Sequence, residues 1–193
     1  GSGLTAPTSK DSTNSSTKAI ATPDDLKGFK IRVPGIAMWV SMFKALGAAP
    51  TVIPFGELYS ALQTKVVDGQ ENPLALISSA KLYEVQKFCA LTGHTWDGHF
   101  IFGNGRKFAS LPKEVQGAIT SQLTAAAIKQ REDIARLNVD AQGQLAKLGV
   151  TFNKPDPAPF RAVLQSAGFY TEWKQKFGDE VWAKLEKYAG KLA

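Results

Sequence analysis

Residues 29–73 of the chain decide its fold, and they read FKIRVPGIAMWVSMFKALGAAPTVIPFGELYSALQTKVVDGQENP. Short runs of β-branched residues alternate here with amphipathic runs, and Gly or Pro residues separate them. This alternation predicts strands at 29–33, 51–55 and 66–69 and helices at 37–46 and 56–65. Strands and helices that alternate at this spacing form βαβ units, so we expect an α/β protein with a parallel sheet.

The N-terminal side of this stretch carries little information about the fold. Residues 1–17 are rich in Ser, Thr, Gly and Asn and show no periodicity, so we expect a flexible or tag-like terminus. Order is predicted to begin at Thr22, which can cap a single helical turn that starts at Pro23 and stops at Gly28.

The C-terminal side is predicted to be mostly helical. Strands are expected at 88–92 and 99–108. A helix at 110–148, about 40 residues long, carries one apolar stripe and can run past two lobes. A further strand at 150–152 and a helical C-terminus from Asp156 complete the prediction. Aromatic residues recur at helical spacing in this terminus, which is typical of core or lobe-bridging helices.

The composition is that of an ordinary globular protein. Of the 193 residues, 44% are hydrophobic and 21% are charged, and no apolar run approaches the roughly 20 residues that span a bilayer. The chain begins without the basic and apolar segments of a signal peptide, so we expect none here. The lone cysteine, Cys89, lies in an apolar run and is expected to be a buried, unreactive thiol. Because no metal-ligand spacing is present, we expect neither a metal ion nor a cofactor.

The net charge of +6 could serve nucleic acid, a membrane surface or an anionic ligand. The lysines, however, are scattered along the predicted helices, and no basic run alternates with aromatic residues. We therefore expect no binding of nucleic acid.

Three residues are predicted to meet where the parallel strands end. Ligands of open α/β sheets bind at this edge, where helix N-termini favour anions. Arg32 lies near the end of the first strand, and Gly35 and Ile36 follow that strand; Phe55 ends the second strand and Asn72 follows the third. A guanidinium can hold both oxygens of a carboxylate, an amide can hydrogen-bond a ligand hydroxyl, and an aromatic face can pack on a carbon skeleton. The pattern therefore predicts a carboxylate site at this edge.

Each of these residues also has a purely structural interpretation. Arg32 could form a surface ion pair, and Asn72 could cap the helix that follows it. Phe55 could be an ordinary core residue. Only the coincidence of the three favours a ligand site.

The same segments carry a resemblance to a known family. Residues 22–34 (TPDDLKGFKIRVP), 54–63 (PFGELYSALQ) and 67–73 (VDGQENP) resemble the second lobe of TRAP-type, DctP-like solute-binding proteins. The resemblance extends from about residue 13 to the C-terminus. It implies a periplasmic-binding-protein-like fold, and a two-lobed periplasmic receptor that closes around a small organic acid and delivers it to the TRAP membrane permease.

The resemblance also implies which residues meet the ligand. They are Arg32, Asn72, Phe55, Ile36, Trp96 and Lys10. Arg32 would grip the carboxylate, and Trp96 would lie near the hinge. Family members often carry a further arginine upstream of these segments. The nearest match in this chain is Lys10, so the chain departs from the family pattern at the second cationic contact.

By the same resemblance, the first lobe of the family is missing from this chain. Residues 18–97 and 137–193 would form the second lobe, and residues 98–136, with much of the long helix, would cross into the absent one. The chain alone should then bind ligand weakly, because lobe closure supplies much of the burial. The surface left by the missing lobe could also make the chain self-associate.

An enzyme and an interaction module are the alternatives to a receptor. An enzyme would need a base or a nucleophile. Only His94 and His99 are available as histidine bases, and no nucleophile elbow, paired carboxylates or phosphate loop is present. We therefore expect His94 to be structural and the chain not to be an enzyme. The alternative function is a helical interaction module, or a truncated fragment that binds no ligand.

Overall fold

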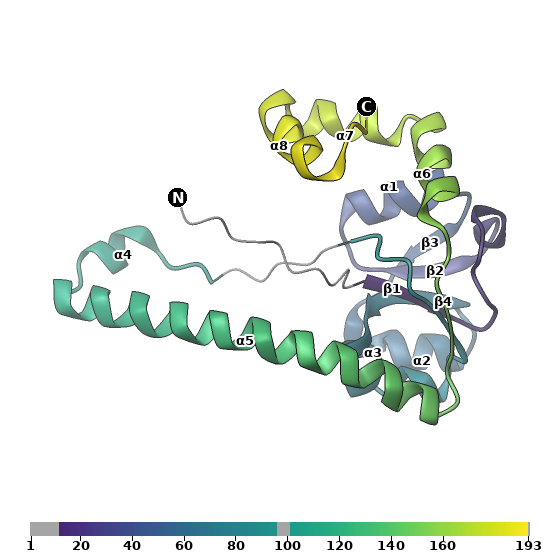
Figure 1. The fold of residues 1–193 in the computed structure, drawn as a ribbon, viewed down its shortest axis with the longest axis horizontal. Helices are drawn as coiled ribbons and strands as arrows, with labels where there is room; N and C mark the ends of the chain where they lie inside the picture. Colours follow the sequence, from purple (N-terminus) through teal and green to yellow (C-terminus); the bar gives the residue numbers. More distant parts are fainter. Residues whose placement is uncertain (1–11, 96–100, 193) are drawn as a thin grey trace.

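The computed structural model of the chain describes residues 12–95 and 101–192. Within them, six strands form one mixed sheet with the order β3-β2-β4-β1-β5-β6. The strands are β1 (Ser12–Ser16), β2 (Lys30–Val33), β3 (Ala49–Val52), β4 (Gly69–Pro73), β5 (Phe88–Ala90) and β6 (Thr151–Asn153). Strand β1 is antiparallel to both of its neighbours, while β2, β3 and β4, and likewise β5 and β6, run parallel. The sheet lies in the body of the molecule (Figure 1).

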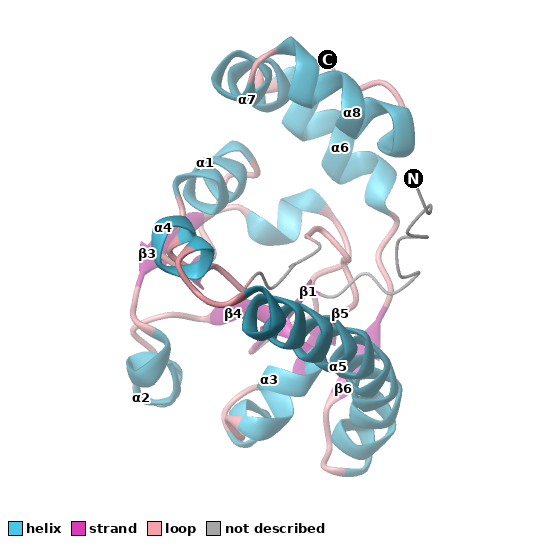
Figure 2. Cartoon of the chain, turned by 90° about the vertical axis from the view of Figure 1, so that its left-hand side faces the viewer, coloured by secondary structure: helices cyan, strands magenta, loops and turns pink. Residues whose placement is uncertain are grey.

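Helices surround this sheet on both faces (Figure 2). The longer ones are α1 (Ala37–Ala45), α2 (Leu58–Gln63), α3 (Leu74–Ser79), α4 (Gly105–Ala109), α5 (Lys113–Lys147), α6 (Pro157–Ser166), α7 (Phe169–Phe177) and α8 (Asp179–Ala189). Single turns are formed by η1 (Pro23–Leu26), η2 (Phe55–Glu57) and η3 (Leu82–Glu84). Along the described residues, no helix combines the length and apolar character that crossing a membrane requires.

Two hydrophobic cores lie on the two faces of the sheet. On one face, α2, α3 and the C-terminal part of α5 bury Leu62, Ile77 and Leu145. On the other face, α1 and the C-terminal helices α6, α7 and α8 bury Phe43 and Trp182. The arrangement is the α/β sheet with surrounding helices that the alternating pattern predicts, but the sheet is mixed rather than parallel, because β1 runs antiparallel to β4 and β5.

Helix α5 leaves the body of the protein along most of its length (Figure 1). Only its C-terminal part is anchored, through the buried Ala141 and Leu145. Towards its N-terminal end it carries exposed apolar side chains, among them Leu123 and Ile128, which are 41% and 55% exposed. Helix α4 lies beside that distant end. The predicted long helix at 110–148 is therefore confirmed within a few residues, at 113–147.

The structure differs from the sequence prediction at β1. Residues 12–16 were expected to belong to an uninformative N-terminal segment, but they form a fully buried strand in the middle of the sheet. The strand reads STNSS and has no apolar alternation, so no hydrophobic pattern could reveal it. The side chains of Thr13 and Ser15 are buried with hydrogen-bond partners on β4. Residues 1–11 lie outside the described residues.

Three further segments differ from the prediction. The second strand was expected at 51–55, whereas β3 is Ala49–Val52 and Phe55 begins η2. The third strand of the βαβ series was expected at 66–69, whereas β4 begins at Gly69 and runs to Pro73. The strand expected at 99–108 is wrong over its described part, because residues 105–109 form α4. The side-chain oxygen of Asn104 accepts a hydrogen bond from the backbone N–H of Lys107 at 3.1 Å and so caps that helix.

Candidate functional site

The site is built where β2, β3 and β4 end, which we call the carboxyl edge of the sheet. These strands are parallel, so their C-terminal ends lie together. In the pairing of β2 with β4, Arg32 lies opposite Gln70. Because side chains alternate along a strand, Arg32, Gln70 and Asn72 project from the same face of the sheet. This face is the one that α2 and α3 cover.

Arg32 is buried at this edge, with 4% of its surface exposed. Its Nε donates a hydrogen bond to the backbone oxygen of Ile53 at 2.8 Å, which holds the side chain against the end of β3. Among the described residues, no carboxylate forms an ion pair with its guanidinium. The interpretation of Arg32 as a surface ion pair is therefore wrong.

The electrostatic environment of Arg32 is unusual for a buried cation. Burial lowers the pKa of Arg32 from its ordinary value, and the negative charge of Glu71 on β4 partly offsets this. Arg32 nevertheless keeps its charge at neutral pH, because the ordinary pKa of arginine lies far above neutrality. The carboxyl edge thus holds a cation whose Nε is paired with a neutral carbonyl oxygen.

An exposed aromatic ring lies beside this cation. The Phe55 ring centroid is 6.0 Å from the Arg32 guanidinium, within the range of a cation–π contact. Phe55 begins the turn η2 after β3 and is 43% exposed, so the alternative that it is a core residue is wrong. Ile36 precedes α1 after β2 and is 46% exposed. Both side chains offer apolar surface at the loops that border the carboxyl edge.

Asn72 lies within β4 rather than at a helix cap. Pro73 occupies the cap position of α3, so the interpretation of Asn72 as a plain helix cap is wrong. The Asn72 side chain donates a hydrogen bond to Oε1 of Gln70, and Nε2 of Gln70 donates to Oγ of Ser15 at 2.7 Å. The Asn72 backbone oxygen accepts from Oγ1 of Thr13 at 3.0 Å. Thr13 on β1 therefore fixes the position of Asn72, and Gln70 on the same strand, held by Ser15, fixes the orientation of its amide.

Sequence reasoning did not find Gln70, Ser15 and Thr13 as supporting residues of the site. The signal for Gln70 was the alternation in GQENP, because Gln70 and Asn72 are two residues apart in a strand. No such signal existed for Ser15 and Thr13, because the strand that carries them was not predicted.

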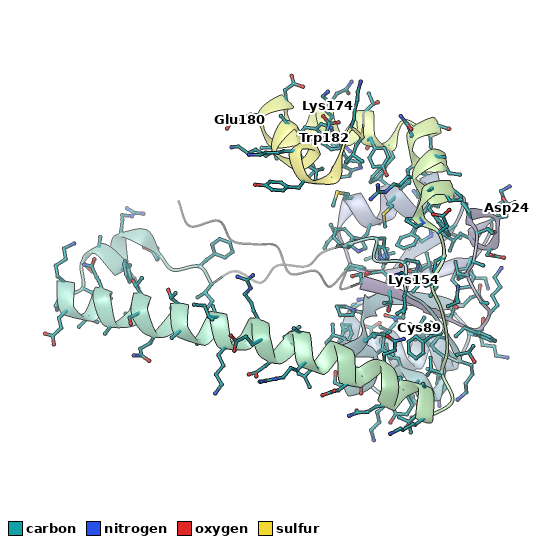
Figure 3. All side chains as sticks on the ribbon, viewed as in Figure 1. Asp24, Cys89, Lys154, Lys174, Glu180 and Trp182 are labelled. Carbon is teal, nitrogen blue, oxygen red and sulfur yellow. The ribbon has the colours of Figure 1, made fainter. Side chains whose placement is uncertain are left out.

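Cys89 is buried in the body of the molecule (Figure 3), and its pairing with Ser15 places it on the same face of the sheet as Gln70. Its Sγ lies 3.4 Å from Oγ1 of Thr13, to which it donates. Burial raises the pKa of Cys89 to about 11, although the hydrogen bond to Thr13 opposes this. The prediction of a buried thiol is confirmed, and a thiol that stays protonated is a poor nucleophile.

The remaining predicted residues are not part of this arrangement. Lys10, Trp96 and His99 lie outside the described residues. His94 lies against the other face of the sheet, where its Nδ1 is 2.7 Å from Oγ1 of Thr92 and its ring meets the edge of Phe43. Packing and hydrogen bonding of this kind favour the structural role expected for His94.

Comparison with known proteins identifies relatives of the chain. Residues 5–175 match the family model for bacterial extracellular solute-binding proteins, family 7. A solute-binding protein of Roseobacter denitrificans is 36% identical over 152 residues, which are 79% of this chain and 47% of the relative. The 2,3-diketo-L-gulonate-binding periplasmic protein YiaO of Escherichia coli is 41% identical over 126 residues, 65% of this chain and 38% of the relative.

Solved structures with a similar fold belong to the same class of protein. A TRAP periplasmic solute-binding protein from a Polaromonas species, bound to D-erythronate, superposes with a TM-score of 0.83 at 29% identity. It covers 91% of this chain, which in turn covers 58% of it. The Roseobacter denitrificans protein with bound L-galactonate gives a TM-score of 0.71 at 33% identity, with 82% and 53% covered.

Two conclusions follow from these comparisons. The chain spans about half the length of the relatives it matches, which agrees with the prediction that a lobe of the family is absent. The relatives named here are solute-binding proteins rather than enzymes, as expected from the lack of catalytic motifs.

Proposed function

The chain belongs to family 7 of the bacterial extracellular solute-binding proteins, and we propose that it forms one ligand-binding lobe of a periplasmic TRAP receptor. The receptor holds a small organic acid at the carboxyl edge of the sheet and delivers it to the membrane permease. Arg32 makes the main contact, to the carboxylate of the ligand.

The observation that carries this proposal is the buried Arg32, whose guanidinium forms no ion pair within the described residues, although the charge of Glu71 acts on it from β4. A buried cation costs several kcal/mol of desolvation unless an anion lies close to it. Only Nε has a hydrogen-bond partner among those residues, so the two terminal nitrogens can meet the two oxygens of a carboxylate in a fork. Each charge-assisted hydrogen bond contributes about 1.5–3 kcal/mol net.

Asn72 and Phe55 complete the proposed contact. The Asn72 amide uses one donor on Gln70 and has a second donor and its oxygen for a ligand oxygen or hydroxyl. The exposed ring of Phe55 offers a flat apolar surface beside the guanidinium, on which the carbon skeleton can pack. Ile36 adds apolar surface at the next loop.

The relatives indicate the class of ligand. YiaO is named for 2,3-diketo-L-gulonate, and the two solved structures hold D-erythronate and L-galactonate. These compounds are sugar-derived acids with one carboxylate and several oxygen substituents. We propose the same class for this chain, because Arg32 suits the carboxylate and the Asn72 amide suits a neighbouring hydroxyl.

The proposed receptor needs a second lobe that this chain does not contain. We propose that residues 98–136 cross into that lobe, with residues 18–97 and 137–193 forming the present one. The exposed, projecting part of α5 supports this, because its apolar side chains have little to pack on here. Trp96 and Lys10 remain proposed contacts near the hinge and the N-terminus. Without lobe closure, the chain should bind acids weakly.

Isothermal titration of D-galacturonate and D-galactose tests the proposal, because the two sugars differ only in the carboxylate. We expect the chain to bind the acid with millimolar affinity and the neutral sugar at least tenfold more weakly. Arg32→Lys should remove most of this difference, since lysine lacks the planar fork. Arg131→Lys, at an exposed position of α5, is the matched control and should behave as wild type. Equal binding of both sugars would contradict the proposal.

A further inference from the structure

A second cavity lies on the opposite face of the sheet from Arg32. Its volume is about 230 Å³, and residues from β1, α1 and the C-terminal helices line it. Asn14 is one of these residues. Because Asn14 lies between Thr13 and Ser15 in β1, its side chain projects away from the face that carries Gln70 and Asn72. The cavity is therefore separate from the carboxyl-edge site.

The walls of this cavity are mostly apolar, and its polar groups are few. Phe43, Leu164 and Phe169 are buried side chains that line it. Its polar lining includes Asn14 and His94. An apolar pocket with a small number of fixed polar groups is the usual construction of a site for a small organic molecule.

Asn14 is the unexplained feature of this cavity. It is 4% exposed, and within the described part of the chain its Oδ1 is buried without a hydrogen-bond partner. Nε2 of His94 is likewise buried without a hydrogen bond, although Oε2 of Glu71 lies 3.4 Å away. Unpartnered buried polar groups are rare in folded proteins and call for a partner. A ligand in the cavity can supply one.

The size and chemistry of the cavity define the partner. A cavity of about 150 Å³ accommodates benzene, so 230 Å³ has room for a substituted benzene ring. A hydroxyl both donates and accepts, and so it can pair with the amide of Asn14 whichever way that amide is turned. Arg161 is exposed and belongs to the lining, so the cavity is open to ligands from solvent.

We propose that this cavity is a second binding site, for a small aromatic compound that carries a hydroxyl group. The ring packs among Phe43, Leu164 and Phe169, and the hydroxyl pairs with the side chain of Asn14. The site does not depend on the organic acid at Arg32, because the sheet separates the two.

The two methionines of the chain provide a direct test. Met38 and Met42 lie one turn apart on α1, and of the two only Met42 is among the residues that line the cavity. In a sample with ¹³C-labelled methionine methyl groups, phenol should shift the Met42 resonance in a saturable way. The Met38 resonance should change much less. Met38→Leu assigns the two signals.

Toluene is the matched ligand control, because a methyl group replaces the hydroxyl of phenol. We expect phenol to bind about fivefold more tightly than toluene, which is the effect of one net hydrogen bond. Asn14→Leu keeps a side chain of similar size, and it should abolish that preference while toluene still binds. Asn104→Leu, at the start of α4 and outside the cavity lining, should keep it.

Three results would overturn the proposal. They are no saturable shift of Met42 with phenol, equal affinity of the wild-type chain for phenol and toluene, and an unchanged preference in Asn14→Leu. If Asn14→Leu does not fold, the first two measurements on the wild-type chain decide the matter. Arg32→Lys should leave phenol binding intact, so failure of this proposal and failure of the receptor proposal are distinguishable.

Discussion

At the scale of single residues, a series of buried polar side chains supports Asn72. Gln70 accepts from Asn72 and donates to Ser15, and Thr13 donates to the backbone of Asn72. All four residues are at least nine-tenths buried. Because such groups are costly when unpartnered, the series holds a single orientation of the Asn72 amide. Gln70 is therefore a positioning residue for the proposed site, although nothing places it in contact with the ligand.

Replacement of Gln70 tests this role. Gln70→Leu removes the acceptor for Asn72 and leaves Oγ of Ser15 without its donor. We expect a loss of about 1–3 kcal/mol in the free energy of unfolding, measured by urea denaturation. We also expect roughly fivefold weaker binding of D-galacturonate in variant protein that is still folded. Gln63→Leu, at an exposed position at the end of α2, should change neither quantity. Unaltered acid affinity in Gln70→Leu would show that Gln70 does not position Asn72.

Gly69 has a different role at the start of β4. A Cβ atom at this position would lie 2.5 Å from the backbone oxygen of Ser15 and 2.7 Å from the ring of Phe29. Only glycine allows β4 to approach β1 and Phe29 this closely.

Gly69→Ala should therefore separate the central strands of the sheet. We predict a destabilisation of about 1–3 kcal/mol, the usual effect of overpacking a core, and the readout is again urea unfolding. At Gly56 a Cβ would meet nothing within 4 Å, so Gly56→Ala should stay within about 0.5 kcal/mol of wild type. Equal effects at the two positions would mean that the close approach at Gly69 is not important for stability.

At the scale of elements, most of helix α5 projects beyond the part of the protein that anchors it. Its C-terminal part packs through Ala141 and Leu145, while Val115, Leu123 and Ile128 are between 40% and 55% exposed. Apolar surface of this kind marks a place where protein is expected to pack. The proposed first lobe would cover it in a complete receptor.

In the isolated chain, we predict that this surface causes self-association. Size-exclusion chromatography with light scattering should show a mass above that of the monomer that rises with protein concentration. Ile128→Glu should shift the chain towards the monomer, and Gln130→Glu, a charge change at an exposed polar position, should have little effect. A monomer at all concentrations would show that the exposed face of α5 does not drive association.

The elements also show what sequence patterns can and cannot predict. Strand β2, helix α1 and the helical C-terminus follow from hydrophobic periodicity, because each buries an apolar side against a core. Helix α5 follows from the same periodicity, although only its C-terminal part is buried here. Strand β1 could not be predicted in this way, since its burial depends on hydrogen bonds to β4 and β5 rather than on apolar side chains. Helix α4 is short and packs on no core, so its sequence carries no strong period.

At the scale of the whole molecule, the chain spans about half the length of the solute-binding proteins that it matches. The sheet brings Arg32 and Phe55 together and aligns Asn72 on the same face, as the positions of the strand ends predict. The sequence could not show that Arg32 is buried without an acidic partner among the described residues, because this depends on packing between strands distant in sequence. The second cavity likewise arises only when the C-terminal helices fold back over α1.

The central claim is that the guanidinium of Arg32 contacts the carboxylate of the ligand. It is tested most directly by NMR of ¹⁵N-labelled arginine side chains during titration with D-galacturonate, with resonances assigned by Arg32→Lys and Arg131→Lys. We predict a saturable shift of the Arg32 Nη resonances, with those of Arg131 unchanged and no shift on addition of D-galactose. If D-galacturonate binds and the Arg32 resonances do not move, the carboxylate lies elsewhere and the account is contradicted.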